Sequence, residues 1–356
     1  MTFGSIFNGC PREQLHYKMS TGTMNSPLVS IVIPAYNAQN FIARSLKSAL
    51  RQTYENIEVI VIDDGSTDKT GEIVRSYQDP RIKYSYQENQ WLGAARNAGI
   101  RKSKGRYITF LDADDFFLPE KVQRQVDFLE KKPEYDIVYC SVLHFYTERP
   151  SRFLKKRVSS YPTGNIFREL LEWPIMNPNA PMFRREVFEK DLMFWDGKEK
   201  YPEDWDLFLR IAQAGFKFGF LDEDLAVVEI RDGSLTTTWE AQWIYKKNTI
   251  VMFENLFSKM DPRERETIDT KKIINKYKFQ LAITHLINDK KREFLEIMDE
   301  LCSGGATLFL RAALFLVPSF IIKRSLINLW KRKQRLTFYV VPRSNDIFRD
   351  ISFLLG

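Results

Sequence analysis

Short apolar runs rich in β-branched residues alternate with helical patterns through the first 140 residues of the chain. The apolar runs predict buried strands over residues 28–34, 57–62, 82–86, 106–111 and 136–140. Helical spacing and N-cap signals between them predict helices over residues 40–52, 68–77, 92–102 and 119–131. Because strands that alternate with helices at this spacing are typical of a largely parallel sheet, we predict an α/β fold, an open sheet with helices on both faces.

The remainder of the chain follows a different pattern. After about residue 140 the alternation weakens, and before residue 240 only one further helix is predicted, over residues 205–214. We therefore expect a flexible lead-in at residues 1–27, an α/β domain at 28–240 and a helical, basic appendage at 241–356. The composition, 44% hydrophobic and 28% charged, is that of a globular chain and excludes a disordered or collagen-like one.

Polar residues directly follow three of the predicted strands. These clusters are Pro-Ala-Tyr-Asn at 34–37, Asp-Asp-Gly-Ser at 63–66 and Asp-Ala-Asp at 112–114. In open α/β sheets ligands bind at the carboxyl ends of the strands. Three such clusters at strand ends therefore predict one ligand site along this edge of the sheet.

Two carboxylates, Asp112 and Asp114, stand one residue apart at the end of the fourth predicted strand. Mg²⁺ and Mn²⁺ prefer oxygen ligands and are commonly held by one or two carboxylates together with phosphate oxygens. The pair is therefore a candidate site for Mn²⁺ or Mg²⁺ beside a diphosphate. The alternative that stays open is an acidic loop that only caps the following helix.

Further candidates lie at other strand ends and helix starts. Asp64 can accept hydrogen bonds from a base or a ribose hydroxyl, although the same segment also fits a turn with an N-cap. Arg96 can contact a phosphate, or it can be a solvated helix charge. Glu203 and Asp204 begin a predicted helix, where the helix dipole keeps a carboxylate ionised and available as a base, or where it only caps the helix.

Taken together, these motifs resemble glycosyltransferase family 2. The resemblance rests on five segments, in the family's order and approximate spacing: residues 34–37, 63–68, 92–99 (Leu-Gly-x-Ala-Arg-Asn-x-Gly), 112–115 and 203–207 (Glu-Asp-Trp-Asp-Leu). It covers roughly residues 28–235. It implies the GT-A fold, a Rossmann-like open mixed sheet, and an inverting transfer of sugar from a nucleotide-diphosphate sugar to an acceptor hydroxyl.

The resemblance also implies roles for individual residues. It places Pro34, Ala35 and Tyr36 beside the nucleotide base, with Asp64 as the acid that reads it, and Arg96 near the nucleotide and sugar. Asp112 and Asp114 match the family's metal-binding DxD pair, Asp114 being the expected direct ligand, and Asp204 matches the general base. Arg231 and Ser234 match a loop that closes over the diphosphate.

The chain departs from the family pattern at two places. The closing loop has Asp232-Gly233 where the family often has a histidine, and Gln90-Trp91 stands where a glycine is common. Trp91 either lines the acceptor cleft or packs in the core. Trp91, Glu203 and Trp205 are the candidate residues for an acceptor site.

The basic charge of the chain is concentrated at its C-terminal end. From Arg311 onward nine Lys or Arg face only two Asp, a net +7 that equals the formal charge of the whole chain. Apolar residues mixed with basic ones over 308–335 fit a helix at an anionic membrane surface, and a helical hairpin packed on the catalytic domain is the alternative. No basic module with interleaved aromatics indicates nucleic acid as a partner.

The expected enzyme is thus a metal-dependent glycosyltransferase, cytoplasmic and peripheral on the inner face of the cell membrane. The expected partners are a nucleotide-sugar donor, guessed to be a UDP-sugar, and a glycan or lipid-linked glycan acceptor in bacterial surface polysaccharide assembly. Two alternatives remain, a non-catalytic sugar-nucleotide-binding module and a nucleotidyltransferase. The Glu203-Asp204 pair argues against the first, and the absence of a Gly-rich basic loop after the first strand argues against the second.

Overall fold

The computed structural model describes residues 26–147, 149–156, 160–197, 201–231, 239–302, 325 and 338–340. Within these residues the strands form one ten-stranded sheet. Its strands are β1 Val29–Ala35, β2 Ile57–Asp64, β3 Ile82–Gln87, β4 Tyr107–Phe110, β5 Phe116–Phe117, β6 Ile137–Tyr146, β7 Arg149–Lys156, β8 Pro181–Arg184, β9 Phe218–Ile230 and β10 Phe338–Val340.

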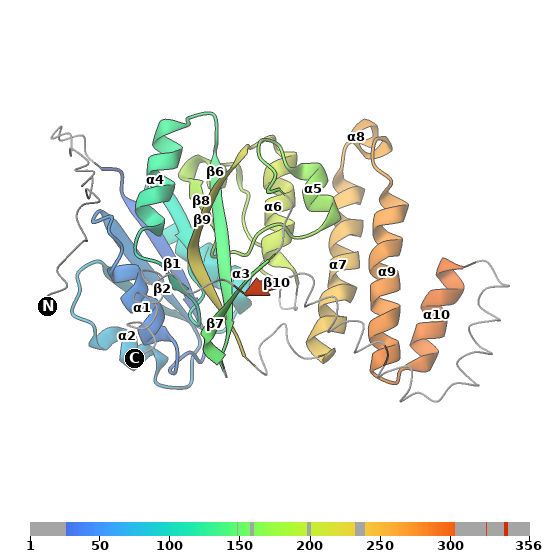
Figure 1. Cartoon of the computed structure of the whole chain (residues 1–356), viewed down its shortest axis with the longest axis horizontal. Coiled ribbons are helices and arrows are strands. Elements are labelled where there is room, and N and C mark those ends of the chain that lie inside the picture. The colour runs from blue at the N-terminus through green and yellow to red at the C-terminus, as the bar shows by residue number, and fades with distance from the viewer. Residues whose placement is uncertain are drawn as a thin grey trace, which may run out of the picture.

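The two longest helices, α7 and α9, come after residue 239 (Figure 1). Those of the first part are α1 Ile42–Leu50, α2 Thr70–Ser76, α3 Trp91–Lys102, α4 Lys121–Lys131, α5 Phe167–Glu172, the 3₁₀ helix η1 Arg185–Lys190, and α6 Glu203–Gln213. Those of the second part are α7 Trp239–Lys259, α8 Pro262–Glu266, α9 Thr270–Ile287 and α10 Lys291–Leu301.

The sheet is mixed. The order β10-β7-β6-β8-β4-β1-β2-β3 places β1 between β4 and β2, and the pairings β4–β1, β1–β2 and β2–β3 are parallel. Strands β8, β7 and β10 add antiparallel pairings, and β9 runs parallel to β6. All five strands and four helices predicted for the first 140 residues occur, with ends shifted by a few residues except that β6 continues to Tyr146. The predicted α/β sheet is therefore confirmed.

Side chains of β1 alternate between two apolar layers. Ile31 and Ile33 belong to the cluster that includes Leu46 of α1 and Val126 of α4, whereas Val32 belongs to the cluster on the other face with α3, α5 and α6. This period of two is the reason why a strand buried on both faces appears in the sequence as an uninterrupted apolar run. Helices therefore cover both faces of the sheet, as Figure 1 shows.

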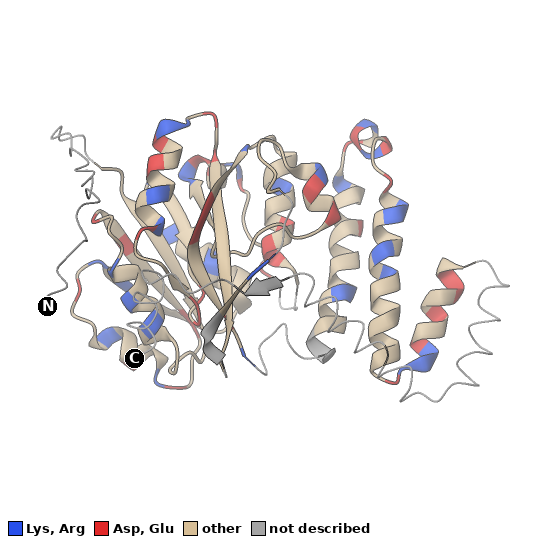
Figure 2. Cartoon of the chain, viewed as in Figure 1, with Lys and Arg blue, Asp and Glu red and all other residues tan. Residues whose placement is uncertain are grey.

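Helices α7, α9 and α10 extend the molecule beyond the sheet (Figure 1). The α7–α9 pair joins the core because Phe253 and Tyr277 pack edge-on against the buried Trp205 of α6. Helix α10 packs on α9 through a small apolar cluster. Figure 2 shows basic residues along α9 and residues of both signs along α10. None of the helices in the described part of the chain has the length and hydrophobicity needed to span a bilayer.

The C-terminal region also contributes a strand that the helical prediction missed. Strand β10 pairs antiparallel with β7, so that Phe338 lies opposite Lys156 and Val340 opposite Leu154. The chain thus returns to the edge of the sheet after the C-terminal helices. The segment 308–335, for which a membrane surface was predicted, lies outside the described residues except for Ser325.

One lysine lies in the core, and the two hydrogen bonds of its amino group go to neutral side chains. Lys121 of α4 is fully buried, and its Nζ donates to Thr109 Oγ1 at 3.0 Å and to Gln125 Oε1 at 2.7 Å. Burial lowers the pKa of Lys121 from 10.5 to about 8. Between these two values the unfolded chain binds more protons than the folded one, so folding stability must rise with pH across this window.

We therefore expect a Lys121→Met variant to lose this pH dependence. The shift corresponds to about 3 kcal/mol between pH 8 and 10.5. Urea unfolding of both proteins, at neutral pH and at about pH 10, measures it. As the pH rises, the free energy of unfolding of the wild type should increase relative to that of the variant. If the two free energies change equally with pH, the lowered pKa of Lys121 is contradicted.

Candidate active site

The three polar clusters converge at one edge of the sheet. Ala35, at the end of β1, lies opposite Asp63 at the end of β2. On the other side of β1, the Leu111 N–H donates to Val32 O at 2.9 Å, and this contact leads the chain directly into Asp112. Because β4, β1 and β2 are parallel neighbours, their carboxyl ends meet as predicted.

Asp64 is a buried, firmly held carboxylate at the end of β2. Its Oδ1 accepts from Gln87 Nε2 at 2.7 Å and from the Gln90 N–H at 2.9 Å. Gly65 follows with φ of +83°, a backbone conformation that suits glycine and turns the chain sharply away. This geometry fixes Asp64 at the edge of the sheet where the sequence predicted a nucleotide contact.

The residues predicted beside the nucleotide base differ in exposure. Pro34 and Ala35 are buried residues of β1, whereas the side chain of Tyr36 is 54% exposed. Tyr36 therefore has an open aromatic ring just beyond the end of β1. The neighbouring strand β2 ends at Asp64. Pro34 and Ala35, being buried, can offer a ligand only their backbone and the shape of the strand end.

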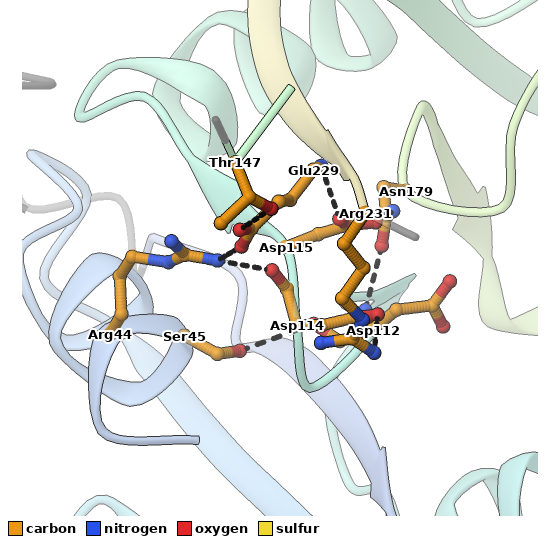
Figure 3. Close-up of polar contacts among 9 residues, drawn as sticks. All are labelled: Arg44, Ser45, Asp112, Asp114, Asp115, Thr147, Asn179, Glu229 and Arg231. Atoms are coloured by element: carbon orange, nitrogen blue, oxygen red, sulfur yellow. Dashed lines mark hydrogen bonds and ion pairs between the residues drawn. The ribbon is translucent and has the colours of Figure 1, made fainter. Parts of the chain in front are cut away.

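Both DxD carboxylates are paired with arginines. Asp112 Oδ1 lies 2.7 Å from Arg96 Nη2. Asp114 Oδ2 lies 2.6 Å from Arg231 Nη2, a pair that Figure 3 shows. Burial and the negative charge of Asp112 raise the pKa of Asp114, and Arg231 opposes the rise. A second cation beside this carboxylate would therefore be stabilised electrostatically.

The backbone of the DxD loop is held from several elements (Figure 3). Arg44 of α1 donates to the carbonyl oxygen of Asp114 and to Glu229 of β9, while the Asp112 N–H donates to Asn179 Oδ1 at 2.7 Å. Asp115 is fully buried, accepting from Asn179 Nδ2 at 2.5 Å and from the Glu229 N–H at 2.9 Å. Burial and the charges of the neighbouring aspartates raise the pKa of Asp115 well above its usual range.

We expect an Arg44→Met variant to loosen this loop. The substitution leaves Glu229 buried without its cation, a change that typically costs about 3–5 kcal/mol. The melting temperature and the affinity for Mn²⁺ with nucleoside diphosphate should both fall, whereas Lys47→Met, at an exposed position of the same helix, should change neither. Unaltered melting of the Arg44 variant would contradict the network.

Arg96 joins two motifs that are far apart in the sequence. Its Nη2 pairs with Asp112, and its Nη1 lies 2.6 Å from Glu203 Oε1, 107 residues further along the chain. The side chain is only 1% exposed, so this position does not support the predicted direct contact of Arg96 with a phosphate. Arg96 instead ties the DxD loop to the N-terminus of α6.

Glu203 and Asp204 are electrostatically unusual carboxyls. Burial raises the pKa of Glu203 to about 7, with Arg96 opposing and Asp204 adding to the rise. The pKa of Asp204 is also raised, first by burial, with Arg96 opposing. A buried carboxylate with a raised pKa at such a site is a candidate general base.

Tyr245 of α7 belongs to the electrostatic surroundings of this pair, although no sequence pattern indicated it. Burial, together with the negative charges of Asp204 and Glu203, raises the pKa of Tyr245 well above its usual range. Helix α7 therefore brings a tyrosine to the Glu203-Asp204 pair. The helical spacing around residue 245 could not have indicated this contact.

Two predicted acceptor residues have opposite surroundings. Trp91 is 40% exposed, with a φ of +72°, so the interpretation that it packs in the core is wrong. Trp205 is 1% exposed, and its Nε1 donates to Leu170 O at 2.8 Å. Trp205 packs in the core because it lies on the inner face of α6, and we therefore remove it from the acceptor surface. Ser234, with Asp232 and Gly233, lies outside the described residues.

The donor set suits a hard divalent cation. Among the described residues no group of three or more His, Cys, Asp or Glu is gathered as a complete metal site. Mg²⁺ and Mn²⁺ at nucleotides, however, need only one or two carboxylates, because phosphate oxygens and water fill the other positions. Asp114 and Asp112 fit this requirement.

The comparisons with known proteins agree with the geometry. The model of Glycosyl transferase family 2 matches residues 30–192. An uncharacterized glycosyltransferase of Rickettsia typhi, RT0329, is 35% identical over 232 residues, which are 61% of this chain and 71% of that protein. This chain belongs to glycosyltransferase family 2. Other relatives from Rickettsia are longer, and the chain spans 31–35% of their length.

Solved structures of this glycosyltransferase fold superpose on the chain. Staphylococcus aureus TarS 1–349 in complex with UDP-GlcNAc aligns with a TM-score of 0.55 at 17% identity, covering 77% of this chain and 80% of TarS. Mannosyltransferase PcManGT from Pyrobaculum calidifontis in complex with GDP-Man and Mn²⁺ aligns with a TM-score of 0.55 at 21% identity, covering 86% and 88%. The GT-A fold of this glycosyltransferase is thereby confirmed.

Proposed function

We propose that this glycosyltransferase moves a sugar from a nucleotide-diphosphate sugar to an acceptor hydroxyl with inversion at the anomeric carbon. The observation that carries the proposal is the pair of ion pairs made by Arg96. They join Asp112 of the DxD loop to Glu203, the immediate neighbour of the proposed base Asp204. The DxD loop, which we assign to the donor, and the start of α6, which holds the proposed base, are thus joined by one network around the buried Arg96.

The donor lies along the carboxyl edge of the sheet in this proposal. Asp64 and the exposed ring of Tyr36 receive the base and ribose, and the diphosphate lies over the DxD loop. Arg231, which directly follows β9 and now pairs with Asp114, is the cation that we assign to a phosphate oxygen. The sugar then points toward the N-terminus of α6.

Asp204 supplies the base. Its carboxylate takes the proton of the acceptor hydroxyl as that oxygen forms a bond to the anomeric carbon, and the bond from this carbon to the diphosphate oxygen breaks. Raised pKa values in the Glu203-Asp204 pair bring the pair closer to neutral pH, where a general base is effective. Arg96 keeps Glu203 and Asp112 in fixed positions during the step.

Asp114 and Asp112 are the residues that would hold Mn²⁺ or Mg²⁺. When bound, such an ion neutralises the developing charge of the diphosphate leaving group. The raised pKa of Asp114 supports this assignment, because burial and Asp112 make an additional cation favourable there.

The class of donor is supported by the solved relatives. TarS was crystallised with UDP-GlcNAc and PcManGT with GDP-Man and Mn²⁺. A UDP-sugar is therefore the first donor to test, followed by GDP-sugars. Release of nucleoside diphosphate from a panel of sugar nucleotides, with Mn²⁺ or with EDTA, tests the proposal. Release that requires the ion supports it, and release of pyrophosphate instead would favour a nucleotidyltransferase.

The acceptor that we propose is a glycan or lipid-linked glycan at the cytoplasmic face of a membrane. The support is compositional, since apolar residues are mixed with basic ones over 308–335 and a basic cluster ends the segment. Co-sedimentation of the whole chain with anionic vesicles tests it. Replacing Lys331, Arg332, Lys333 and Arg335 by Gln should reduce pelleting, and equal pelleting of both proteins would remove this segment as the anchor.

A further inference from the structure

We propose that Trp195 forms, together with Trp91, a stacking platform for the acceptor saccharide. This inference rests on the proposed function, because it assigns the acceptor side of the same site. Sequence patterns did not single out Trp195. The residue lies in the loop between η1 and α6, shortly before the Glu203-Asp204 pair.

Trp195 is exposed although it is rigidly held. Its indole is 42% exposed and stacks on Tyr201, with ring centroids 5.0 Å apart and an interplanar angle of 29°. A Cβ added at Gly197 would lie 2.5 Å from the indole Nε1, so that only glycine leaves room for the ring there. One part of the indole is therefore supported by protein and another part is open to solvent.

The backbone on the N-terminal side of the indole is clamped as well. Asn97 Nδ2 donates to Phe194 O at 2.9 Å, and the Phe194 N–H donates to Asn97 Oδ1 at 2.9 Å. Phe194 itself is buried. A side chain held in this way does not lose much conformational freedom when a ligand stacks on it.

The same clamp places Trp195 beside the first turn of α3. A Cβ at Gly93 would lie 1.8 Å from the carbonyl oxygen of Trp195, so the loop touches the helix where a side chain would be. Trp91 opens this turn and is also half-exposed, with its backbone in the left-handed region. Trp91 and Trp195, both partly exposed, are therefore positioned at the same end of α3.

The loop also contacts the catalytic network. The guanidinium carbon of Arg96 lies 5.2 Å from the centroid of the Phe194 ring, and Arg96 pairs with Glu203. On the other side of Trp195, Tyr201 leads into α6, and its hydroxyl lies 3.4 Å from Asp206 Oδ1. Trp195 therefore lies toward the end of the site that holds the base, whereas Trp91, which follows the Gln90 N–H bound to Asp64, lies on the side toward the proposed nucleotide end.

A saccharide fits this surface chemically. A sugar ring has an apolar face of C–H groups and a polar rim, and an exposed indole offers a large rigid apolar face with one N–H. An acceptor ring stacked there would bring its hydroxyl toward Asp204 while the donor occupies the DxD loop. The occupant to which the geometry points is thus the acceptor and not the donor.

Steady-state kinetics of the whole chain, with a panel of methyl glycosides and oligosaccharides as acceptor probes, test the platform. Nucleoside diphosphate release is measured with water as acceptor and with each probe. For Trp195→Ala we expect the KM for the acceptor to rise roughly 10-fold, with donor KM and release to water unchanged. Trp195→Phe should restore part of the loss, and Phe279→Ala, an exposed aromatic on α9, should change nothing. An unchanged acceptor KM, or an equal rise in donor KM, would overturn the platform.

Fluorine NMR of the chain labelled with 5-fluorotryptophan gives an answer that does not need turnover. The chain has seven tryptophans, and Trp195→Phe assigns the signal of interest without removing an aromatic ring from the loop. Methyl glycosides should shift this signal and leave that of the buried Trp205 in place. A shift without any nucleoside diphosphate release would refute the proposed function and keep the platform. A signal that stays fixed while transfer proceeds would refute the platform alone.

Discussion

An Asp204→Asn variant should lose sugar transfer by roughly 10²–10⁴-fold, the usual contribution of a general base. The amide has nearly the shape of the carboxylate but cannot take the proton of the acceptor hydroxyl. Donor and ion binding should persist, because they depend on Asp64 and Asp114. Nucleoside diphosphate release at saturating donor, together with calorimetric titration of the donor, separates the two effects.

Asp206→Asn is the matched control for this variant. Asp206 lies on the same turn of α6, but its carboxylate pairs with Arg210, at 2.7 Å, instead of facing the Arg96 network. It should transfer sugar at close to the rate of the wild type when the acceptor is saturating, because its contact with the Tyr201 hydroxyl bears only on the proposed acceptor platform. Wild-type turnover of the Asp204 variant, or an equal loss in both variants, would remove Asp204 as the base.

The pH profile gives an independent measure of the same group. Burial raises the pKa of Asp204 and that of Glu203, the latter to about 7. A base acts only when deprotonated, and burial raises the pKa of Asp204, so the fall of turnover on the acid side should lie at a higher pH than the pKa of an ordinary aspartate. If turnover falls only near the pKa of an ordinary aspartate, burial does not raise the pKa values of this pair.

Asp114→Ala should weaken binding rather than chemistry alone. The substitution removes the carboxylate that we assign to the ion, and we expect the affinity for donor in the presence of Mn²⁺ to fall by roughly 10²-fold. The fold should tolerate the change, because Asp114 is partly exposed and Asp115 and Asn179 still anchor the loop.

Asp222→Ala serves as the control for the loss of one carboxylate. Asp222 is a largely exposed residue of β9, with Lys155 at 3.9 Å. Titration of donor into each protein, with Mn²⁺ and with EDTA, measures the effect. If EDTA lowers the donor affinity of the wild type to that of the Asp114 variant, the ion and the carboxylate act together in donor binding. Equal donor affinity of the wild type and the Asp114 variant in Mn²⁺ would contradict the assignment.

The sheet and its carboxyl edge could be predicted because the information is local. Strands β1 and β2 are buried on both faces, so apolar residues dominate their sequences, interrupted only by Ser30 and Glu58, and the polar clusters that follow mark where those strands end. The long strand β9 escaped prediction because Asp222, Glu223 and Asp224 interrupt its apolar pattern, and its pairing with β6 shifts register there. Such a strand is defined by its neighbours.

The support of the site could not be predicted because it is made by tertiary contacts. The charges of Arg44 and Arg96 look like those of any solvated helix arginine in the sequence, yet each is buried against carboxylates from distant segments. Trp205 was assigned to a surface from its motif, whereas the inner face of α6 buries it. Trp195 and Tyr245 carry no local signal, since loop exposure and the packing of α7 decide their positions.

The central claim is that Asp64, Asp114 and Asp204 meet around one ion-bound sugar nucleotide. Diffraction from crystals grown with Mn²⁺ and a donor that supports turnover tests it directly, with anomalous data collected at the manganese edge. We predict a manganese peak on the Asp114 carboxylate, the nucleotide base beside Asp64, and the Asp204 carboxylate facing the anomeric carbon. A donor bound away from the DxD loop, or a sugar out of reach of Asp204, would contradict the account.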